Sequence, residues 1–415
     1  MTIRHVDVAI IGGGPGGLAV AQGLKKNGIE VAVFERDRAR TDYVQGFRLR
    51  LRQRGLDALK ANLPEHLFEA FLATLGRAPT ENLALDDQFN PVQNPAWGSA
   101  EPEDTHVEKS VSRITLRQIL LSGLEDVVQV GVAFERYETQ SDGTVIAHFS
   151  DGSAVHANLL VGADGAGSQV RRQLLPELKS IDTGVRRLAG KMTLAAAAHH
   201  DISPLLLDYN TNIRPRDGHG LMVTSHRIQP EAFAQYGYFG QDDATHSDLT
   251  GFHFNNTTSY VWWNTAYELD ELGPDSLLDT LGGAELLEVL LSRIGHWDER
   301  ILRLIRNTDP STVALLKVRS STPGAVWETG PVTLLGDSIH AMTYFRALGG
   351  NTALYDSGLL VPQLVAARDG KPLRQAVRDY EDAMREHGYE AVRSSLSAMQ
   401  RNVAAGRTAK SVAAE

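Results

Sequence analysis

A short apolar segment that leads into three spaced glycines constrains the fold of this chain more than any other feature. Residues 6–11 have the Val and Ile content of a buried parallel strand, and Gly12, Gly14 and Gly17 follow with the spacing G-x-G-x-x-G. In such a unit the first glycine forms a tight turn, and the second lets the backbone approach a pyrophosphate. The third lets the next helix pack closely on the strand. The segment therefore predicts a β-α-β unit.

The residues that follow complete this unit. Pro15 suits the first position of a helix, where its missing N–H costs nothing, and Gly28 suits the position just after the helix. A second strand over 31–34 ends at Glu35, where an acid can bind the hydroxyl pair of a ribose. The acid favours an unphosphorylated ribose, so we expect FAD or NAD rather than NADP here, with phosphate at the helix N-terminus.

Size and composition limit the class of protein. The 415 residues exceed one ordinary core, so we expect two domains. A net charge of −10 argues against nucleic acid as a partner. The absence of cysteine excludes disulfides, thiolate catalysis and cysteine-ligated metals. We find no signal peptide and no apolar segment of transmembrane length, so we expect a cytoplasmic enzyme without a membrane span.

Basic residues gather after the second strand. Seven arginines lie between Arg36 and Arg54, and we expect one or two of them to meet phosphate or an anionic cofactor tail, the alternative being a solvated surface. Further along, Ser112 is placed to cap a helix that begins at residue 113. Arg113 and Arg117 are four residues apart and share one side of that helix.

Two later segments repeat the pattern of a strand followed by polar residues and glycines. Asp164 and Gly165 follow the strand expected over 155–161, where ligands collect in a parallel sheet, although an ordinary turn is the alternative. Near the end of the chain, a strand from residue 332 ends in Gly336-Asp337, and the expected helix over 352–367 comes soon after.

The stretch between these segments has a different character. Residues 180 to about 310 contain clustered strands, expected at 187–195, 220–224 and 251–263, which suggests an antiparallel sheet in a second domain. A helix is expected over 277–305. Four aromatic residues share one strand parity and are candidates to line a substrate pocket, the alternative being plain sheet core: Phe252, Phe254, Tyr260 and Trp262.

In combination, the glycine-rich unit, the Asp-Gly segment and the Gly-Asp segment resemble the single-component FAD-dependent aromatic hydroxylases, which are para-hydroxybenzoate hydroxylase-like flavoprotein monooxygenases. Residues 164–171 (Asp-Gly-Ala-Gly-Ser-Gln-Val-Arg) fit the family's second motif throughout. The late motif fits at six positions, while residues 180–310 are barely constrained. Those positions are Gly336, Asp337, His340, Gly349, Asn351 and Asp356.

The resemblance implies an α/β fold. It would pair a discontinuous, Rossmann-like FAD-binding domain with a second, mainly antiparallel β-sheet substrate domain and a C-terminal helix. The FAD-binding domain would cover 1–179, with a substrate-domain strand near 78–106, and would return at 311–370. The substrate domain would cover 180–310, and the C-terminal helix and tail 371–415.

The resemblance also implies which residues bind FAD. The first motif would cradle the pyrophosphate and hold the adenosine ribose, the second would contact FAD and take part in NAD(P)H use, and the third would hold the ribityl region and the flavin's pyrimidine edge. The expected cofactor-binding residues are Gly12, Gly14, Pro15, Gly16, Gly17, Glu35, Arg36, Arg113, Arg117, Asp164, Gly165, Gly336, Asp337, Gly349, Gly350 and Asn351.

The activity implied by the resemblance is monooxygenation. NADPH or NADH would reduce FAD, and O2 would be used through a flavin C4a-hydroperoxide to hydroxylate or otherwise oxygenate an electron-rich, aromatic small molecule. One alternative is a flavin-dependent reductase or dehydrogenase on the same fold. A non-catalytic FAD-binding protein is another alternative, but it would be expected to have a damaged cofactor motif, and this chain has none.

One departure from the family pattern concerns the loop before the glycines of the late motif. Where the family has proline, this chain has Tyr344, so we expect a different wall beside the reactive face of the flavin. The sequence assigns no general base, and the catalytic candidates are Tyr344, Arg346 and His340. We expect no metal site, because the adjacent pair His199-His200 has no third ligand near it in the sequence.

Overall fold

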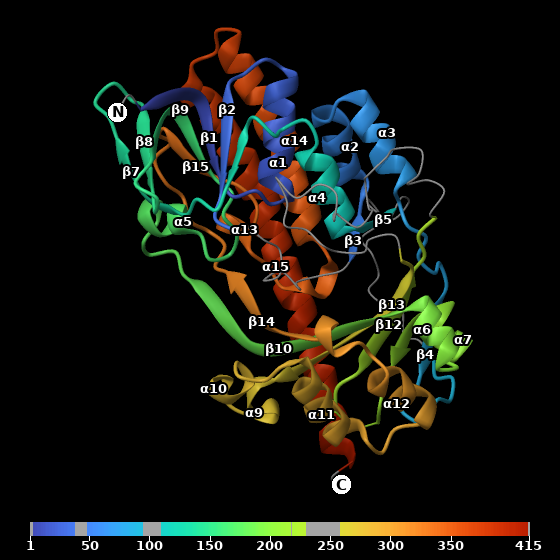
Figure 1. Ribbon diagram of the computed structural model, residues 1–415. Helices are drawn as coiled ribbons and strands as arrows, with labels where there is room; N and C mark the ends of the chain where they lie inside the picture. The colour runs from blue at the N-terminus through green and yellow to red at the C-terminus, as the bar shows by residue number, and fades with distance from the viewer. Residues whose placement is uncertain (1–2, 38–47, 94–108, 217, 230–257, 414–415) are drawn as a thin grey trace.

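The computed structural model describes residues 3–37, 48–93, 109–216, 218–229 and 258–413. Two large sheets lie at different ends of the molecule in Figure 1, with helices packed around each. Two of the expected pocket aromatics, Phe252 and Phe254, lie outside the described residues. Within them, no helix combines the length and the apolar character needed to cross a membrane.

The first sheet has seven strands in the order β6-β2-β1-β9-β8-β7, with β15 beside β9. β1 pairs in parallel with β2 and β9, as the β-α-β unit requires, while β7 and β8 are antiparallel. β7 was not anticipated. Because β15 begins at residue 332 and β1 at residue 4, segments that lie far apart in the sequence build this sheet together. The strands are β1 (Arg4–Ile11), β2 (Val31–Glu35), β6 (Val128–Val130), β7 (Phe134–Thr139), β8 (Val145–Phe149), β9 (Ala154–Gly162) and β15 (Val332–Leu334).

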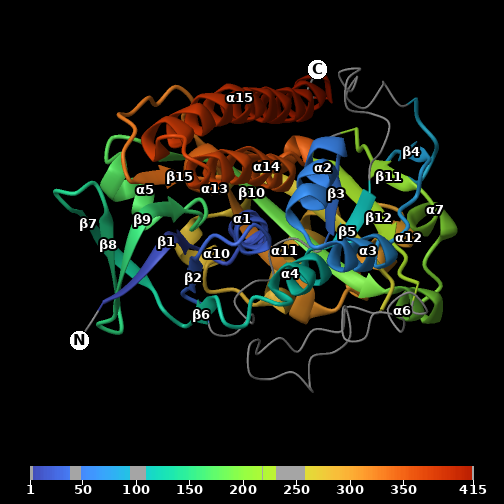
Figure 2. The same ribbon diagram turned by 90° about the horizontal axis from the view of Figure 1, so that it is seen from above.

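Helices cover one face of this sheet and join it to the C-terminal part of the chain. α14 packs against α1 and α2 and also against α15, which extends across the upper edge of Figure 2. α14 begins at Gly349, three residues before the expected start. A separate pair of strands lies nearby, and the elements of this region are α1 (Pro15–Lys26), β3 (Arg48–Leu51), α2 (Gln53–Asn62), α3 (Glu65–Ala73), β5 (Lys109–Ser112), α4 (Arg113–Leu121), α5 (Gln169–Leu174), α13 (Asp337–His340), η5 (Tyr344–Arg346), α14 (Gly349–Arg368) and α15 (Leu373–Ala413).

The second sheet has six strands in the order β14-β10-β13-β12-β11-β4 and is antiparallel except where β11 meets β4. Together with the first sheet and the C-terminal helix, it confirms the α/β class and the mainly antiparallel second sheet. The expected helix over 277–305 is wrong as one element, since three short helices occupy it. The elements are β4 (Asn82–Leu85), β10 (Ser180–Thr193), α6 (Leu194–His199), α7 (Pro204–Leu207), β11 (Asn210–Ile213), β12 (Leu221–His226), β13 (Tyr260–Glu268), α9 (Leu269–Leu272), α10 (Asp275–Leu278), α11 (Gly283–Ile294), α12 (Glu299–Arg306), η4 (Pro310–Thr312) and β14 (Ala314–Ser321).

Local capping explains two of these boundaries. The strand expected to reach Ala195 stops at Thr193, because the Thr193 hydroxyl accepts from the Ala196 N–H and starts α6. The expected cap at Ser112 is present, with its hydroxyl 3.4 Å from the Thr115 nitrogen. Side chains that bond their own backbone thus end a strand or begin a helix where apolar periodicity alone gives no signal.

The long helix α15 connects the two halves of the molecule. It packs against α13 and α14 beside the first sheet, and against η5 and the second-sheet strand β14. In Figure 1 it passes behind the space between the two sheets. The loop 343–348, which contains η5, is therefore held between α15 and the second sheet.

The glycine turn yields the first prediction. A Cβ added at Gly17 would lie 2.3 Å from the Gly12 carbonyl oxygen, whereas one added at Gly14 would meet nothing within 4 Å. Gly17→Ala should therefore lower the free energy of unfolding by about 1–3 kcal/mol. Gly14→Ser, which keeps a good helix cap, should change it by less than about 0.5 kcal/mol. Urea unfolding of protein from which any bound nucleotide has been removed measures both, and equal effects would contradict this account of the turn.

Candidate active site

Of the three motif glycines between β1 and α1, two are fixed by close contacts within the protein and one is not. Gly12 has φ +110°, and a Cβ there would lie 2.3 Å from the Ala163 carbonyl oxygen. Gly17 is fixed by its close approach to Gly12. Gly14 has an ordinary extended conformation and open space where its Cβ would be. The turn therefore fits a group that approaches the backbone at Gly14, beside the N-terminus of α1.

Two of the expected cofactor contacts bond the turn itself. A Glu35 carboxylate oxygen accepts from the Gly13 N–H at 2.7 Å, and the Arg117 Nε donates to the Gly13 carbonyl at 3.0 Å. Arg36 is exposed at the end of β2. The structure thus brings Glu35 and Arg117 to the glycine turn, and their direct contact with a cofactor stays a prediction.

Asp164 is bound within its own turn. Its carboxylate accepts from the Ser168 hydroxyl and from the backbone N–H groups of Gln169, at 2.7 Å, and Val170. These bonds satisfy the first turn of α5. The buried Arg171 then donates to the Ser338 carbonyl at 2.8 Å, which joins the Asp-Gly segment to the Gly-Asp segment. Capping therefore explains Asp164 without a ligand, and its contact with FAD stays a prediction.

The Gly-Asp segment forms a tight turn between β15 and α13. Gly336 has φ +64°, and its N–H donates to the Asp356 carboxylate at 2.8 Å. The neighbouring Asp337 side chain is exposed, yet desolvation by the surrounding protein raises its pKa despite the nearby charges of His340 and Arg113. Asp337 and Arg113, two of the expected cofactor contacts, therefore lie close enough to influence each other.

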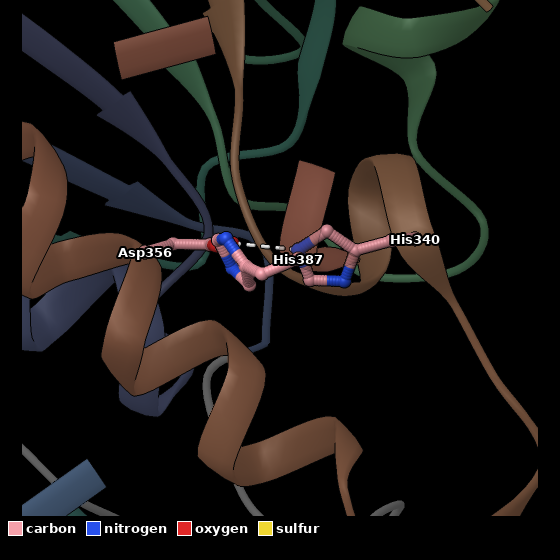
Figure 3. A group of neighbouring side chains, drawn as sticks. All are labelled: His340, Asp356 and His387. Atoms are coloured by element: carbon pink, nitrogen blue, oxygen red, sulfur yellow. Dashed lines mark hydrogen bonds and ion pairs between the residues drawn. The ribbon is translucent and has the colours of Figure 1, made fainter. Parts of the chain in front are cut away.

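Behind this turn, three helices bring together His340, Asp356 and His387 (Figure 3). His340 Nε2 lies 2.7 Å from one oxygen of the Asp356 carboxylate, and His387 Nε2 lies 2.8 Å from the other. His340 and Asp356 are completely buried. The cluster was not anticipated, because its members lie far apart in sequence, although His340 and Asp356 both belong to the late motif.

The hydrogen bonds of this cluster bear on its charges. His387 Nδ1 lies 2.8 Å from the Ala383 carbonyl oxygen, so both of its nitrogens face oxygen atoms. Burial would raise the pKa of Asp356, but the charge of His340 and the hydrogen bonds from both histidines outweigh it and lower the pKa to about 2. Burial likewise opposes the charged form of His340, whose pKa is nevertheless raised by Asp356.

The spacing of the three side chains would also suit a metal ion. We interpret the cluster as a hydrogen-bonded ion network, because both carboxylate oxygens already accept hydrogen bonds and the Gly336 N–H points at one of them. The adjacent pair His199 and His200 lies at the C-terminal end of α6.

The first turn of α14 contains the expected flavin contacts Gly349, Gly350 and Asn351. The Asn351 side chain accepts from the Arg52 N–H and donates to the Arg50 carbonyl, both at 2.7 Å. It thus holds β3 and α2 against α14. The backbone N–H groups of this turn are the first of a helix and have no partner four residues earlier in it, so their role toward a flavin stays a prediction.

The three catalytic candidates lie in different surroundings. Tyr344 stacks beside the Arg187 guanidinium, whose carbon lies 4.2 Å from the ring centroid, and burial raises the pKa of Tyr344 to about 12. Arg346 instead donates to the Ser394 hydroxyl of α15. His340 lies in the buried ion network. Tyr344 contacts the second sheet through Arg187, on the same face as Trp262.

Comparisons with known proteins agree on one family. A family model described as "FAD binding domain" matches residues 5–250 and 306–395, more than half of the chain. The dual O-methyltransferase/FAD-dependent monooxygenase CTB3 of Cercospora beticola is 29% identical over 91% of this chain. This chain spans only 44% of that relative, less than half of its length.

In two further comparisons the similarity covers most of this chain and most of the other protein. The 3-amino-4-hydroxybenzoate 2-monooxygenase of Streptomyces cremeus is 28% identical over 92% of this chain and 84% of its own length. A crystal structure of a Photorhabdus luminescens protein assigned as an FAD-containing monooxygenase has a TM-score of 0.78 and 28% identity, covering 96% of this chain and 98% of its own.

The ion network yields the second prediction. Asp356→Asn leaves two histidines without their buried counter-charge and should lower the free energy of unfolding at pH 7 by about 3–5 kcal/mol. The folded pKa of Asp356 is depressed, so its stabilisation is present above the unfolded pKa and is lost as the pH falls from about 4 to 2. The difference between wild type and variant should shrink over that range.

Urea unfolding at several pH values measures this difference. Asp369→Asn is the matched control, because Asp369 follows the end of the same helix, is exposed and pairs with Arg368. It should change the free energy of unfolding by less than about 1 kcal/mol. A pH-independent difference for Asp356→Asn would contradict the assigned charges.

Proposed function

Because the chain belongs to the FAD binding domain family, we propose that it is an FAD-dependent monooxygenase that uses NAD(P)H and O2 to oxygenate an electron-rich, aromatic small molecule. The observation that carries the cofactor assignment is Gly14. Its backbone faces open space at the N-terminus of α1, between two glycines that packing requires. A pyrophosphate there would accept from backbone N–H groups and meet the positive end of the helix dipole.

Several other expected cofactor-binding residues support this proposal. Glu35 and Arg117 hold the turn in shape, and Arg113 and Asp337 lie near each other. Gly349–Asn351 would present N–H groups to the flavin ring, where they favour the negative charge of the reduced form.

Bound FAD supplies the electron transfer from NAD(P)H and the activation of O2. The reaction balances as NAD(P)H, a proton, O2 and the substrate giving NAD(P)+, water and the oxygenated product. The chain's own residues bind the two ligands, orient the substrate ring and exclude water, which would otherwise divert oxygen to peroxide. The second sheet and the loop 343–348 are the elements we assign to the substrate side.

Flavin content gives the third prediction. The protein should purify yellow with about one FAD per chain, bound without a covalent link. Gly14→Asp keeps a good helix cap but places a carboxylate where the pyrophosphate would lie, so FAD affinity should fall by at least about tenfold. Gly28→Asn is the control, since it fills open space at the opposite end of α1. Unchanged FAD binding in folded Gly14→Asp protein would refute the assignment.

Turnover gives the fourth prediction. FAD-loaded protein should oxidise NADPH or NADH faster when a suitable phenolic or polycyclic aromatic is present, and should consume O2 and the nicotinamide in equal amounts. The second candidate, a reductase without oxygenation, is favoured by Tyr344 in place of the family proline. It would oxidise NAD(P)H but yield no oxygenated product with any member of the panel.

A further inference from the structure

The second sheet has one apolar and one polar face. Because side chains alternate along a strand, Leu188 and Trp263 lie on the face that packs in the apolar core with α11 and α12. Arg187 of β10 and Trp262 and Asn264 of β13 lie on the opposite face. That opposite face contacts Tyr344 in the loop before α14, so it is turned toward the proposed flavin site.

Four buried side chains on the polar face have a polar atom with no hydrogen-bond partner among the residues that the structure describes. They are 0–9% exposed, and strand register places them on neighbouring strands of one face. Buried polar groups in folded proteins are nearly always hydrogen-bonded, so a cluster of exceptions on one face indicates a ligand. The atoms are Asn212 Nδ2, His226 Nε2, Trp262 Nε1 and Asn264 Nδ2.

Arg187 orients one of these groups and adds a positive charge. Its Nε donates to the Asn264 Oδ1 at 3.2 Å, which leaves the Asn264 NH2 as a donor turned elsewhere. Its guanidinium stacks on Tyr344 and lies 5.6 Å from the Trp262 ring. No carboxylate pairs with it within the described ranges, and desolvation lowers its pKa. A desolvated cation without a counter-charge favours an anionic ligand.

Three neighbouring groups on this face, those of Arg187, Trp262 and Asn264, share one chemical property. The guanidinium, the indole N–H and the amide NH2 all donate hydrogen bonds, and none of them can accept one. His226 differs, because burial lowers its pKa to about 3 and it stays neutral, with Nδ1 2.8 Å from the Ser110 hydroxyl. Two other cations reach this face farther from Tyr344, since Lys191 lies over the Tyr260 ring and Arg48 donates to the Thr224 hydroxyl. The positive charge nearest Tyr344 is that of Arg187.

We propose that Arg187, Trp262 and Asn264 form a subsite for an anionic oxygen group on the aromatic substrate, either a ring carboxylate or an ionised phenol. This inference rests on the proposed function and specifies its substrate class. Arg187 binds the oxygen edge-on while Tyr344 covers the flat face of its guanidinium, an arrangement that suits bidentate recognition. Since Tyr344 lies five residues before Gly349, the subsite holds the substrate ring beside the expected flavin position.

Binding to the FAD-loaded protein, without NAD(P)H, tests the proposal. The probes are pairs of aromatics that differ in charge: para-hydroxybenzoate with para-hydroxybenzamide, a hydroxynaphthoate with its amide, and para-nitrophenolate with para-nitroanisole. Calorimetry and the flavin absorption spectrum report the affinity. The first two pairs test a carboxylate, and the third tests a phenolate. In at least one pair the ionised member should bind at least about tenfold more tightly, as charged hydrogen bonds predict.

Two variants assign that preference to the subsite. Arg187→Met keeps an unbranched, flexible stem but removes the charged guanidinium, and Trp262→Phe keeps a ring without the N–H. Each should weaken binding of the ionised member, by about tenfold for Arg187→Met, and leave the neutral member within about twofold. Arg300→Met is the control, because Arg300 also lies over an aromatic ring, that of Phe89, but belongs to α12 on the apolar side of the sheet.

Stability separates the ligand role from a structural one. If Arg187 only braced the loop through its stacking on Tyr344, Arg187→Met would lower the thermal midpoint and weaken both members of each pair alike. We expect the midpoint to stay the same or rise, because an uncompensated cation is removed. Equal affinity for both members in every pair would overturn the proposal. Oxygenation of neutral aromatics with no such preference would leave the proposed function standing and refute this inference alone.

Discussion

The buried Asp356 carboxylate is the interaction on which the arrangement of the cofactor site depends. It accepts from the Gly336 N–H and from histidines on α13 and α15, so it fixes the Gly-Asp turn and two helices at one point. A carboxylate at this depth is stable only with its donors in place, so the three elements move as one. From this point α15 extends to η5 and β14, which sets the second sheet relative to the first.

The same separation between structural and ligand-facing groups recurs around the site. Gly12 and Gly17 satisfy the packing of α1 on the sheet, whereas Gly14 leaves its backbone open. Several expected cofactor contacts instead accept hydrogen bonds from the protein's own backbone N–H groups and so hold the shape of the site. They are Glu35, Asp164 and Asn351. On the polar face of the second sheet, several buried donors have no hydrogen-bond partner within the part of the chain that the structure describes. Cofactor and substrate are thus assigned to the surfaces where the protein leaves its polar groups unused.

A structural feature can be predicted from the sequence when the residues that determine it are neighbours along the chain, and less well when they are far apart. The β1-α1-β2 unit and the Ser112 cap follow from neighbouring residues and are confirmed. The continuous helix over 277–305 is wrong, because the chain leaves the helical conformation near Gly282 and near Gly295, the two caps of α11. His387 joins Asp356 only through the packing of α15. The shared face of Tyr260 and Trp262 was predicted, but only the register with β10 and β12 shows that this face is polar.

The central claim is that this chain transfers one oxygen atom from O2 to an aromatic substrate bound between the second sheet and the flavin. The most direct measurement is turnover of FAD-loaded protein under isotopically labelled O2, with mass spectrometry of the product. The account predicts that one heavy oxygen atom enters the product and that label is absent when only the water is labelled. A product labelled from water, or NAD(P)H oxidation that sends all of the O2 to peroxide with every substrate, would contradict it.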